Sequence, residues 1–396
     1  MSEATYIVGD VFDVMATLPD SSVDLVLTSP PFLALRSYLP ADHPDKGKEI
    51  GSEPTPAEFI DTLLALTAEW ERVLAPHGSI CVELGDTYAG GGNGPDARNA
   101  GADHESNAAE RWTGTRNGWP MDKSLTGIPT LYAWSLAYGR NLLTGEPSPA
   151  GQWRIRNVVA WCRPNPPVGA LGDKYRQATS YITIATKARD RWFDLDAVRT
   201  APASTDRRQA AYEANGASGA FHDHSNDEIG RQQGPKPASG GVSNPAGAPP
   251  LDWWQVPTEP YKGSHYATWP RKLLTRPIES MCPREVCTAC GEPRRRIVEN
   301  HGSPYLFSYH QGQDGGSSTG GMGGHTAVRN VTTTGWTDCE CGAPFRPGIV
   351  LDPFAGSGTT LAVATGLGRD AIGIDIDKRN LDLACERVGM FLKETT

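Results

Sequence analysis

The sequence has no long hydrophobic run. No stretch of about 18 apolar residues occurs in its 396 residues, and the first ten residues, MSEATYIVGD, lack the basic and apolar regions of a signal peptide. We therefore expect a soluble, intracellular protein that is cytoplasmic and has no membrane partner.

The sequence also has fewer positively than negatively charged residues. The chain carries 37 Lys and Arg against 46 Asp and Glu, which gives a formal net charge of −9. A protein coated with basic side chains for nucleic-acid binding is therefore not expected, although a local basic cleft is compatible with this total. Residues 271–296, which hold seven Lys or Arg and three Glu, form a locally basic stretch.

Cysteine is sparse, with eight residues in the chain. In a protein of this length without a secretion signal, this number argues against a disulfide framework and favours reduced thiols, a metal site or both. Glycine and proline are abundant instead, at 44 and 32 residues. Such a composition predicts a globular protein with an unusual amount of loop.

The N-terminal half alternates between strand and helix patterns. Short apolar or β-branched runs predict strands at residues 6–8, 23–27, 79–84, 156–164 and 180–188. Apolar residues at helical spacing predict one helix that starts at Pro56 and stops at Gly78, and another at residues 129–143. A strand, a helix and a strand in this order indicate a parallel sheet.

Two stretches lack this periodicity. Residues 88–127 are rich in Gly, Asn, Asp and Ala, and predict a long surface insertion. Residues 201–250 are rich in Ala, Gly, Ser, Asn and Pro, which is typical of a segment that is disordered or becomes ordered on a partner.

The C-terminal residues 348–392 have the clearest pattern. A strand, a glycine turn, a helix, a second strand and an amphipathic helix follow one another, and predict a βαβα unit. The glycines of the DPFAGSG turn, residues 352–358, let a ligand approach the free N–H groups of the following helix. Asp375 ends the next strand about twenty residues later, where an acidic side chain would bind a ribose diol.

This glycine turn has two interpretations. It is either a tight strand-to-helix connection without a ligand or part of a nucleoside site. A phosphate-binding loop is not expected, because GSGTT at residues 356–360 has no lysine to meet a phosphate charge. A dinucleotide also fits poorly, and an adenosyl ligand without phosphates fits better.

The order of two motifs carries a family resemblance. TSPPF at residues 28–32 precedes DPFAGSGTT at residues 352–360, and GDVFDVMATLPDSSVDLVLTSPPF, NVVAWCRPNP and GSHYATWPRKLLTRPIE match in the same order. This arrangement resembles the S-adenosylmethionine-dependent, amino-methylating DNA methyltransferases of the permuted (β) class. The resemblance implies an α/β, Rossmann-like class I methyltransferase fold, with helices on both faces of a mostly parallel, twisted sheet. It also implies double-stranded DNA as the substrate.

The resemblance further implies roles for individual residues at the cofactor. Asp352 and the glycine turn would contact the methionine part of S-adenosylmethionine, Asp375 the ribose, and Asp10 the region of the adenine amino group. Asp10 is alternatively a turn acid or a helix cap. The complete set expected at the cofactor is Asp10, Thr28, His265, Ala267, Thr268, Asp352, Pro353, Phe354, Ala355, Gly356, Ser357, Gly358 and Asp375.

Ser29, Pro30, Pro31 and Phe32 match the catalytic motif of this family. The exocyclic nitrogen of cytosine or adenine is a poor nucleophile because its lone pair is conjugated into the ring, so hydrogen bonds must draw it out of plane. Ser29 would accept from or orient the amino group, and the Pro30 carbonyl would face the same nitrogen. Pro31 stiffens the turn, and Phe32 would stack on a base swung out of the duplex. The resemblance implies direct methyl transfer without a covalent enzyme intermediate.

Serine at the first position of this motif is usual in enzymes that make N4-methylcytosine, whereas Asp or Asn is usual in adenine-directed ones. Ser29 therefore favours cytosine N4, and adenine N6 stays open. Methylation of cytosine C5 is not expected, because it needs a thiolate that is generally presented as Pro-Cys, and no Pro-Cys occurs. An inactive DNA-binding module and a methyltransferase that acts on RNA or protein are less favoured readings of the same motifs.

Two cysteine pairs predict a metal site. Cys287 and Cys290 form one pair, Cys339 and Cys341 the other, each pair is followed by glycine, and 48 residues separate them. Four thiolates can close a tetrahedral zinc site, which would be structural because no position stays open for a substrate. The alternative is unligated thiols in loops, since the C-x-C half is shorter than usual. Cys282 is close enough in sequence to serve as a substitute ligand.

Three consecutive arginines, Arg294, Arg295 and Arg296, lie between the cysteine pairs. They are either a DNA contact or a solvated basic face.

The patterns divide the chain into parts. These are the catalytic half of the methyltransferase domain at 1–87, a flexible insertion at 88–127, the continued sheet at 128–200, a variable target-recognition or disordered segment at 201–250, a cofactor-pocket segment at 251–283, a zinc-ribbon insertion at 284–346 and the S-adenosylmethionine-binding half at 347–396. We expect base recognition in the variable segments. A cognate restriction endonuclease is compatible with this family, and no oligomeric state is predicted.

Overall fold

The computed structural model describes residues 2–35, 37–89, 117–166, 173–200, 248–259, 269–301 and 330–395. The chain forms two compact units, one made of Met1–Asp194, Leu251–Arg295 and Asp338–Thr396, the other of Leu195–Pro250 and Arg296–Thr337. Most of the expected insertions at 88–127 and 201–250 lies outside the described residues, as do His265, Ala267 and Thr268.

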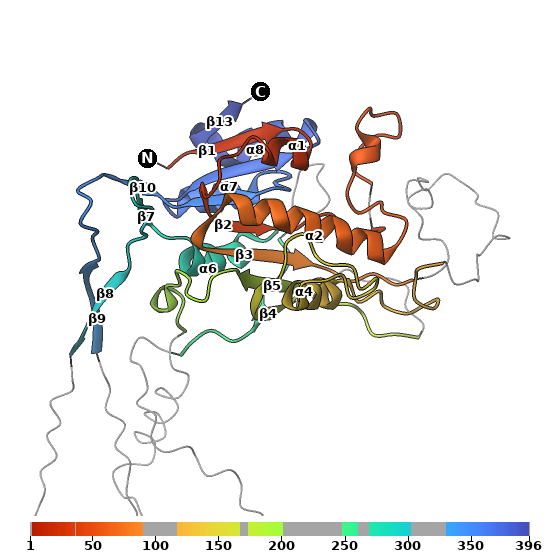
Figure 1. Ribbon diagram of the computed structural model, residues 1–396, viewed down its shortest axis with the longest axis horizontal. Coiled ribbons are helices and arrows are strands. Elements are labelled where there is room, and N and C mark those ends of the chain that lie inside the picture. Colours follow the sequence, from red (N-terminus) through yellow and green to blue (C-terminus); the bar gives the residue numbers. More distant parts are fainter. Residues whose placement is uncertain are drawn as a thin grey trace, which may run out of the picture. The chain divides into compact units, whose positions relative to one another are not determined.

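A nine-stranded sheet forms the centre of the first unit (Figure 1). Its strands are, in spatial order, β13 (Leu392–Thr395), β1 (Ala4–Val8), β12 (Asp370–Asp375), β11 (Ile349–Asp352), β2 (Val23–Thr28), β3 (Leu74–Leu84), β5 (Thr179–Thr186), β4 (Arg154–Cys162) and β6 (Trp253–Gln255). All pairings from β13 to β3 are parallel, whereas β5 is antiparallel to both β3 and β4. The predicted α/β fold with a mostly parallel sheet is confirmed.

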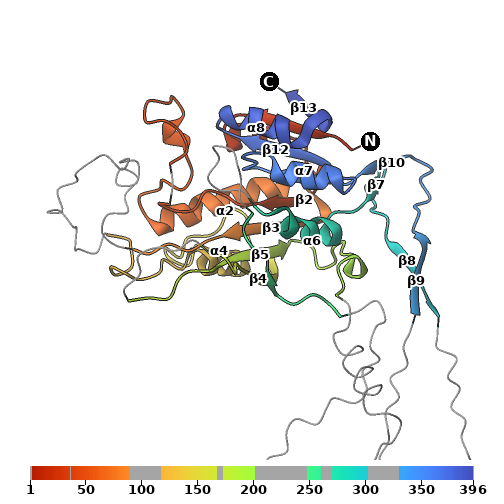
Figure 2. The same ribbon diagram turned by 180° about the vertical axis from the view of Figure 1, so that it is seen from behind.

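Helices cover both faces of this sheet (Figures 1 and 2). They are α1 (Val11–Met15), α2 (Pro56–Val73), α4 (Ile128–Tyr138), α6 (Arg271–Met281), α7 (Thr359–Gly366) and α8 (Arg379–Val388). Because successive strand residues point to opposite faces, Val26 packs in one hydrophobic cluster with α1, α2 and α4. Leu25 and Leu27 pack in another with α6, α7 and α8. Among the described helices, none combines the length and the apolar character that crossing a bilayer requires.

Two helices are shorter than the sequence pattern predicts. Helix α2 begins at the N-cap residue Thr55, whose hydroxyl accepts from the Glu58 N–H and donates to the Glu58 carboxylate. It ends at Val73 and not at Gly78, because Leu74 turns extended and pairs with Val23 at the start of β3. Helix α4 ends at Tyr138, since Gly139 adopts a left-handed conformation with φ +67°.

The region expected to form one zinc ribbon, residues 284–346, is divided between the two units. In the first unit, β7 (Glu285–Cys287) pairs antiparallel with β10 (Phe345–Pro347). In the second, β8 (Arg296–His301) pairs antiparallel with β9 (Asn330–Trp336). The chain therefore leaves the first unit just after one cysteine pair and re-enters it just before the other.

Candidate active site at the carboxyl ends of the strands

A cavity of about 680 Å³ lies at the carboxyl ends of the parallel strands. Its lining includes Gly9 after β1, Ser29 after β2, Asp352 at the end of β11 and Asp375 at the end of β12. Parallel strands present their carboxyl ends at one edge of a sheet, where α/β proteins bind ligands. The TSPPF turn and the DPFAGSG turn consequently face the same cavity.

A buried carboxylate connects these two turns. Thr28 Oγ1 donates a hydrogen bond of 2.8 Å to Asp352 Oδ1, Thr360 donates to Oδ2, and the Phe354 N–H donates to Oδ1 at 3.1 Å. Burial raises the pKa of Asp352, and these donors oppose the rise. The Asp352 side chain is only 3% exposed. Because its hydrogen-bond donors come from three segments, it joins the end of β2, the glycine turn and the start of α7.

The glycine turn needs backbone freedom. Gly356 and Gly358 have φ of +50° and +73°, a region that side chains other than glycine rarely adopt. The Gly356 carbonyl accepts from the Tyr6 hydroxyl at 2.7 Å, and its N–H donates to Asp375 Oδ2 at 2.8 Å. Burial raises the pKa of Tyr6, so its hydroxyl stays a donor. Sequence reasoning missed Tyr6, because a tyrosine in a strand ordinarily indicates core packing.

Asp375 keeps acceptor capacity toward the cavity. Its Oδ2 accepts from the Gly356 N–H, and its Oδ1 accepts from the Asp377 N–H at 2.8 Å and from Asn380 Nδ2 at 3.1 Å. A carboxylate has about four acceptor positions, so one is left for a ligand hydroxyl. Burial raises the pKa of Asp375 to about 6 despite these donors.

Asp10 lines the cavity and also caps α1. Its Oδ1 accepts from the backbone N–H groups of Phe12 at 3.0 Å and Asp13 at 3.2 Å. Asp10 is therefore the helix cap that the sequence allowed as one interpretation. Since both bonds use the same oxygen, a contact from Oδ2 to a ligand is compatible with it.

Ser29 is paired with a carboxylate that the sequence did not reveal. Its Oγ donates to Glu83 Oε2 at 2.6 Å, and Glu83 is 3% exposed. Burial raises the pKa of Glu83, whereas the Ser29 hydrogen bond and the charge of Arg163 oppose the rise. One signal was available: an acidic residue inside the apolar run SICVEL, whose strand lies next to β2 with Val82 opposite Thr28.

The Phe32 ring lies against a glycine. A Cβ at Gly85 would be 2.5 Å from Phe32 Cε2, which no real side chain tolerates. Phe32, Pro30 and Pro31 all line the cavity with Ser29. All four predicted catalytic residues thus line the same cavity.

The predicted cofactor residues divide into two described groups. Those that line the cavity are Asp10, Asp352, Pro353, Phe354, Ala355, Gly356, Ser357 and Asp375. Thr28 and Gly358 are outside the lining, where Thr28 bonds to Asp352 and Gly358 caps α7. The lining also includes Trp161, Arg163 and Trp269, none of which was predicted as a site residue.

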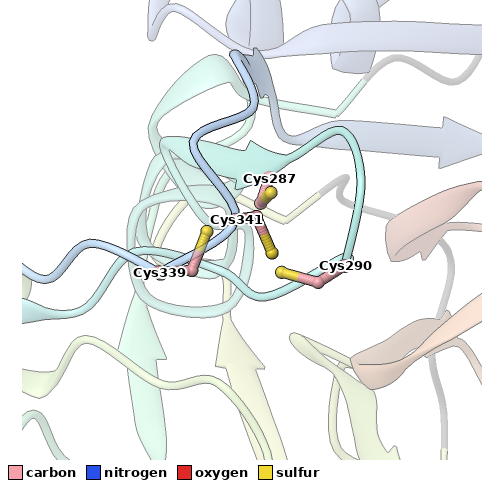
Figure 3. Close-up of side chains that lie close together, drawn as sticks. All are labelled: Cys287, Cys290, Cys339 and Cys341. Carbon is pink, nitrogen blue, oxygen red and sulfur yellow. The ribbon is translucent and has the colours of Figure 1, made fainter.

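The four predicted metal ligands converge in the first unit. The sulfur atoms of Cys287, Cys290, Cys339 and Cys341 lie within 4.8 Å of one another (Figure 3). Cys282 is fully buried in the core with α6 and is not part of this cluster. The idea that it replaces a ligand is not supported.

Arg294 and Arg296 each contact a residue of their own unit. Arg294 donates to Glu285 Oε2 at 3.0 Å, and its guanidinium lies over the Phe345 ring at 4.1 Å. Arg296 donates to Thr333 at 2.9 Å. Whether these arginines contact DNA or form a solvated basic face stays a prediction.

Comparisons with known proteins show the family to which the chain belongs. The model of the DNA methylase family of N6 and N4 methyltransferases matches residues 23–286 and 345–386. Type II methyltransferase M.Cfr9I of Citrobacter freundii is 24% identical over 392 residues, which cover 98% of this chain and 88% of the relative. For M.SmaI of Serratia marcescens the identity is 24% over 383 residues, 96% and 89% of the two chains.

Among solved structures, the PvuII DNA methyltransferase (cytosine-N4-specific) aligns over 98% of this chain and 86% of its own, with 12% identity and a TM-score of 0.48. The family match covers well over half of the chain, including the catalytic and the glycine turns. The chain therefore belongs to the DNA methylase family, whose members methylate exocyclic amino groups with S-adenosylmethionine.

Proposed function

We propose that this protein methylates the N4 amino group of cytosine at a specific sequence in double-stranded DNA. The observation that carries the proposal is the Ser29 to Glu83 hydrogen bond, in the same cavity as Gly356 and Asp375. This places a serine, the residue usual in enzymes that make N4-methylcytosine, in the same cavity as a glycine turn suited to a nucleoside cofactor.

The cavity residues fit S-adenosylmethionine, which supplies an electrophilic methyl group when bound. Asp375 has an acceptor position for a ribose hydroxyl. The backbone of the glycine turn allows close approach of a ligand. No lysine or arginine lies in the turn, which agrees with a cofactor that carries no phosphate.

Ser29 is set up to act as an acceptor. Because its proton is committed to Glu83, its lone pairs remain for an N–H of the target amine, and the Pro30 carbonyl is a second acceptor. Together they would draw the nitrogen lone pair out of conjugation. The nitrogen that gains a methyl group must lose a proton, and Ser29 would pass this proton to Glu83, whose pKa burial has raised.

Phe32 would hold the flipped base. Its ring rests against Gly85 on the cavity wall, where it offers a face for stacking.

Adenine N6 is the second candidate, because the matched family includes both N6 and N4 enzymes. Ser29 favours cytosine. Mass spectrometry of nucleosides from the DNA of cells that express the chain distinguishes the two, and N4-methylcytosine is expected. N6-methyladenine alone would overturn the base assignment.

An inactive DNA-binding module is the alternative from another class. It would transfer no tritium from labelled S-adenosylmethionine to DNA, whereas we expect transfer to DNA and not to RNA or protein.

Two relatives are Type II methyltransferases by name, so we also propose a role in restriction-modification in the cytoplasm, with a cognate endonuclease. Base recognition by residues 201–250 stays a prediction.

A further inference from the structure

Each cysteine pair sits on a turn that directs both sulfur atoms to one point. After Cys287, the Gly291 N–H bonds back to the Cys287 carbonyl at 3.0 Å, with Gly291 in a left-handed conformation at φ +71°. The amides of Ala289 and Cys290 also hydrogen bond to the Cys287 sulfur.

The second turn repeats these features. Gly342, directly after Cys341, has φ +65°, and the Cys341 amide hydrogen bonds to the Cys339 sulfur. The two turns are tied together where Thr288 donates to the Pro344 carbonyl from its N–H at 3.0 Å and its hydroxyl at 2.8 Å. Two separate segments of the chain are therefore shaped to bring four sulfur donors together.

We propose that Cys287, Cys290, Cys339 and Cys341 bind one structural zinc ion. Four sulfur donors within 4.8 Å of one another suit a tetrahedral ion. Zinc and iron both accept such ligands, and zinc is favoured because methyl transfer moves no electrons between protein and substrate. The site is independent of the proposed reaction, since four thiolates leave no open position for a ligand.

The ion would stabilise the segment that leads into the active-site strand. Cys287 pairs with Phe345 in the β7 and β10 ladder, which is only three residues long. The next residue, Arg346, donates to Asp24 Oδ2 at 2.7 Å, and the Ile349 N–H donates to the same oxygen at 2.7 Å. Strand β11 follows and ends at Asp352.

Closing the chain at this point has an entropic cost. The 48 residues between Cys290 and Cys339 form a loop whose ends must meet, and this cost grows with loop length. An ion bound by all four thiolates would offset this entropic cost, because it joins both ends of the segment directly. Without the ion, the three-residue ladder, the Thr288 contacts and the pairing of β8 with β9 would hold the two ends together.

Metal analysis of the full-length protein tests the site. We expect one zinc per chain, and at least a tenfold loss of bound zinc in Cys290→Ser and Cys341→Ser. Cys162→Ser, a half-buried cysteine outside the cluster, should keep its zinc. A protein that binds no zinc when zinc is supplied, that keeps zinc in both cluster variants, or that binds iron instead would overturn the proposal.

A second measurement does not depend on whether the variants fold. Cobalt added to the metal-free wild-type protein should give the intense visible spectrum of a tetrahedral four-thiolate site. An octahedral spectrum would contradict it.

The structural role is tested by hydrogen exchange with and without a chelator. Removal of zinc should raise exchange at 285–287 and 345–349, and leave α2 unchanged. Equal exchange in both states would overturn this role. None of these three measurements uses methylation, so failure of the zinc site and failure of the proposed function are distinguishable.

Discussion

Thr28 and Asp352, 324 positions apart in the sequence, share a buried hydrogen bond of 2.8 Å. This bond joins the residue before Ser29, the proposed catalytic residue, to the first residue of the proposed cofactor turn. It follows from the sheet order, in which β2 and β11 are parallel neighbours. The TSPPF turn and the DPFAGSG turn, which we propose hold the target amine and the methyl donor, are therefore joined by a direct hydrogen bond.

Removal of this bond should weaken cofactor binding as well as stability. In Thr28→Val, Asp352 loses one of its donors while the side-chain volume is kept, and we expect the free energy of unfolding to fall by about 1 to 2 kcal/mol. The affinity for S-adenosylmethionine should also fall. Calorimetric titration and denaturant unfolding measure the two effects. Thr17→Val, at an exposed threonine that bonds to the nearby Val14 carbonyl, is the control that should change neither.

Glu83→Gln should slow methyl transfer and leave cofactor binding intact. The amide cannot take the proton that Ser29 passes on, so we expect a loss of about 100-fold or more in single-turnover rate. Because Ser29 and Glu83 act as a unit, adding Ser29→Ala to this variant should cost little more. Glu71→Gln, at a carboxylate that pairs with Lys187 on the surface, should retain the wild-type rate. Fully additive losses would contradict a shared role.

Binding of S-adenosylmethionine should depend on pH through Asp375. Burial raises the pKa of this carboxyl to about 6, and only the ionised form offers all its acceptor positions to a ribose. As pH falls below 6 the carboxyl protonates, so Kd should rise, approaching about tenfold per pH unit. Isothermal titration with S-adenosylhomocysteine separates binding from chemistry. The Asp375→Asn variant should bind weakly with a flat profile, and a flat profile in the wild type would refute the assignment.

Gly85→Ala should displace the Phe32 ring. The added Cβ would lie 2.5 Å from Phe32 Cε2, so the ring must move away from its place on the cavity wall. Small errors of position at a reacting group can cost about 100-fold in rate. We expect kcat/KM for DNA to fall on this scale, with unchanged affinity for S-adenosylmethionine. Gly366→Ala, where the added methyl meets nothing within 4 Å, is the matched control.

Arg346→Met should destabilise the fold. Asp24 is 0% exposed, and hydrogen bonds from His77 and Arg346 hold its pKa below the ordinary value although burial alone would raise it. Without Arg346, a buried carboxylate loses its main charge partner, at a cost of about 3 kcal/mol. Chemical denaturation measures the loss, and Asp24→Asn should recover part of it. Lys123→Met, at an exposed pair with Asp173, should have little effect.

The lowered pKa of Asp24 also predicts how the stability of the protein changes with pH. Because its folded pKa is lowered, the stability from Asp24 is present above its ordinary pKa and is lost as pH falls through the folded value. In Asp24→Asn this component of the pH dependence should disappear.

Much of the architecture was predictable from local sequence patterns. The strands around Val26 and Val350 are short apolar runs, and the glycine turn before α7 is marked by residues that permit positive φ. The cysteine pairs were found in the same way, since each pair lies within one turn. These features depend on neighbours in the chain, so a local pattern suffices.

Other predictions were wrong, or a feature was missed, because the residue responsible lies far away in the sequence. Helix α2 ends early because Leu74 pairs with Val23 on another strand, a contact that helical periodicity does not report. Tyr6 was missed because its hydroxyl bonds to the Gly356 carbonyl, which is 350 positions away in the sequence.

The sequence by itself determined which chemical groups are available: Ser29 and its prolines, the glycine turn, Asp375 and four cysteines. Only the tertiary structure decided which groups meet. Glu83 becomes the partner of Ser29 because β3 lies beside β2 in a definite register. Strand register arises from pairing between distant segments, and a hydrogen bond between two strands exists only once both are in the same sheet.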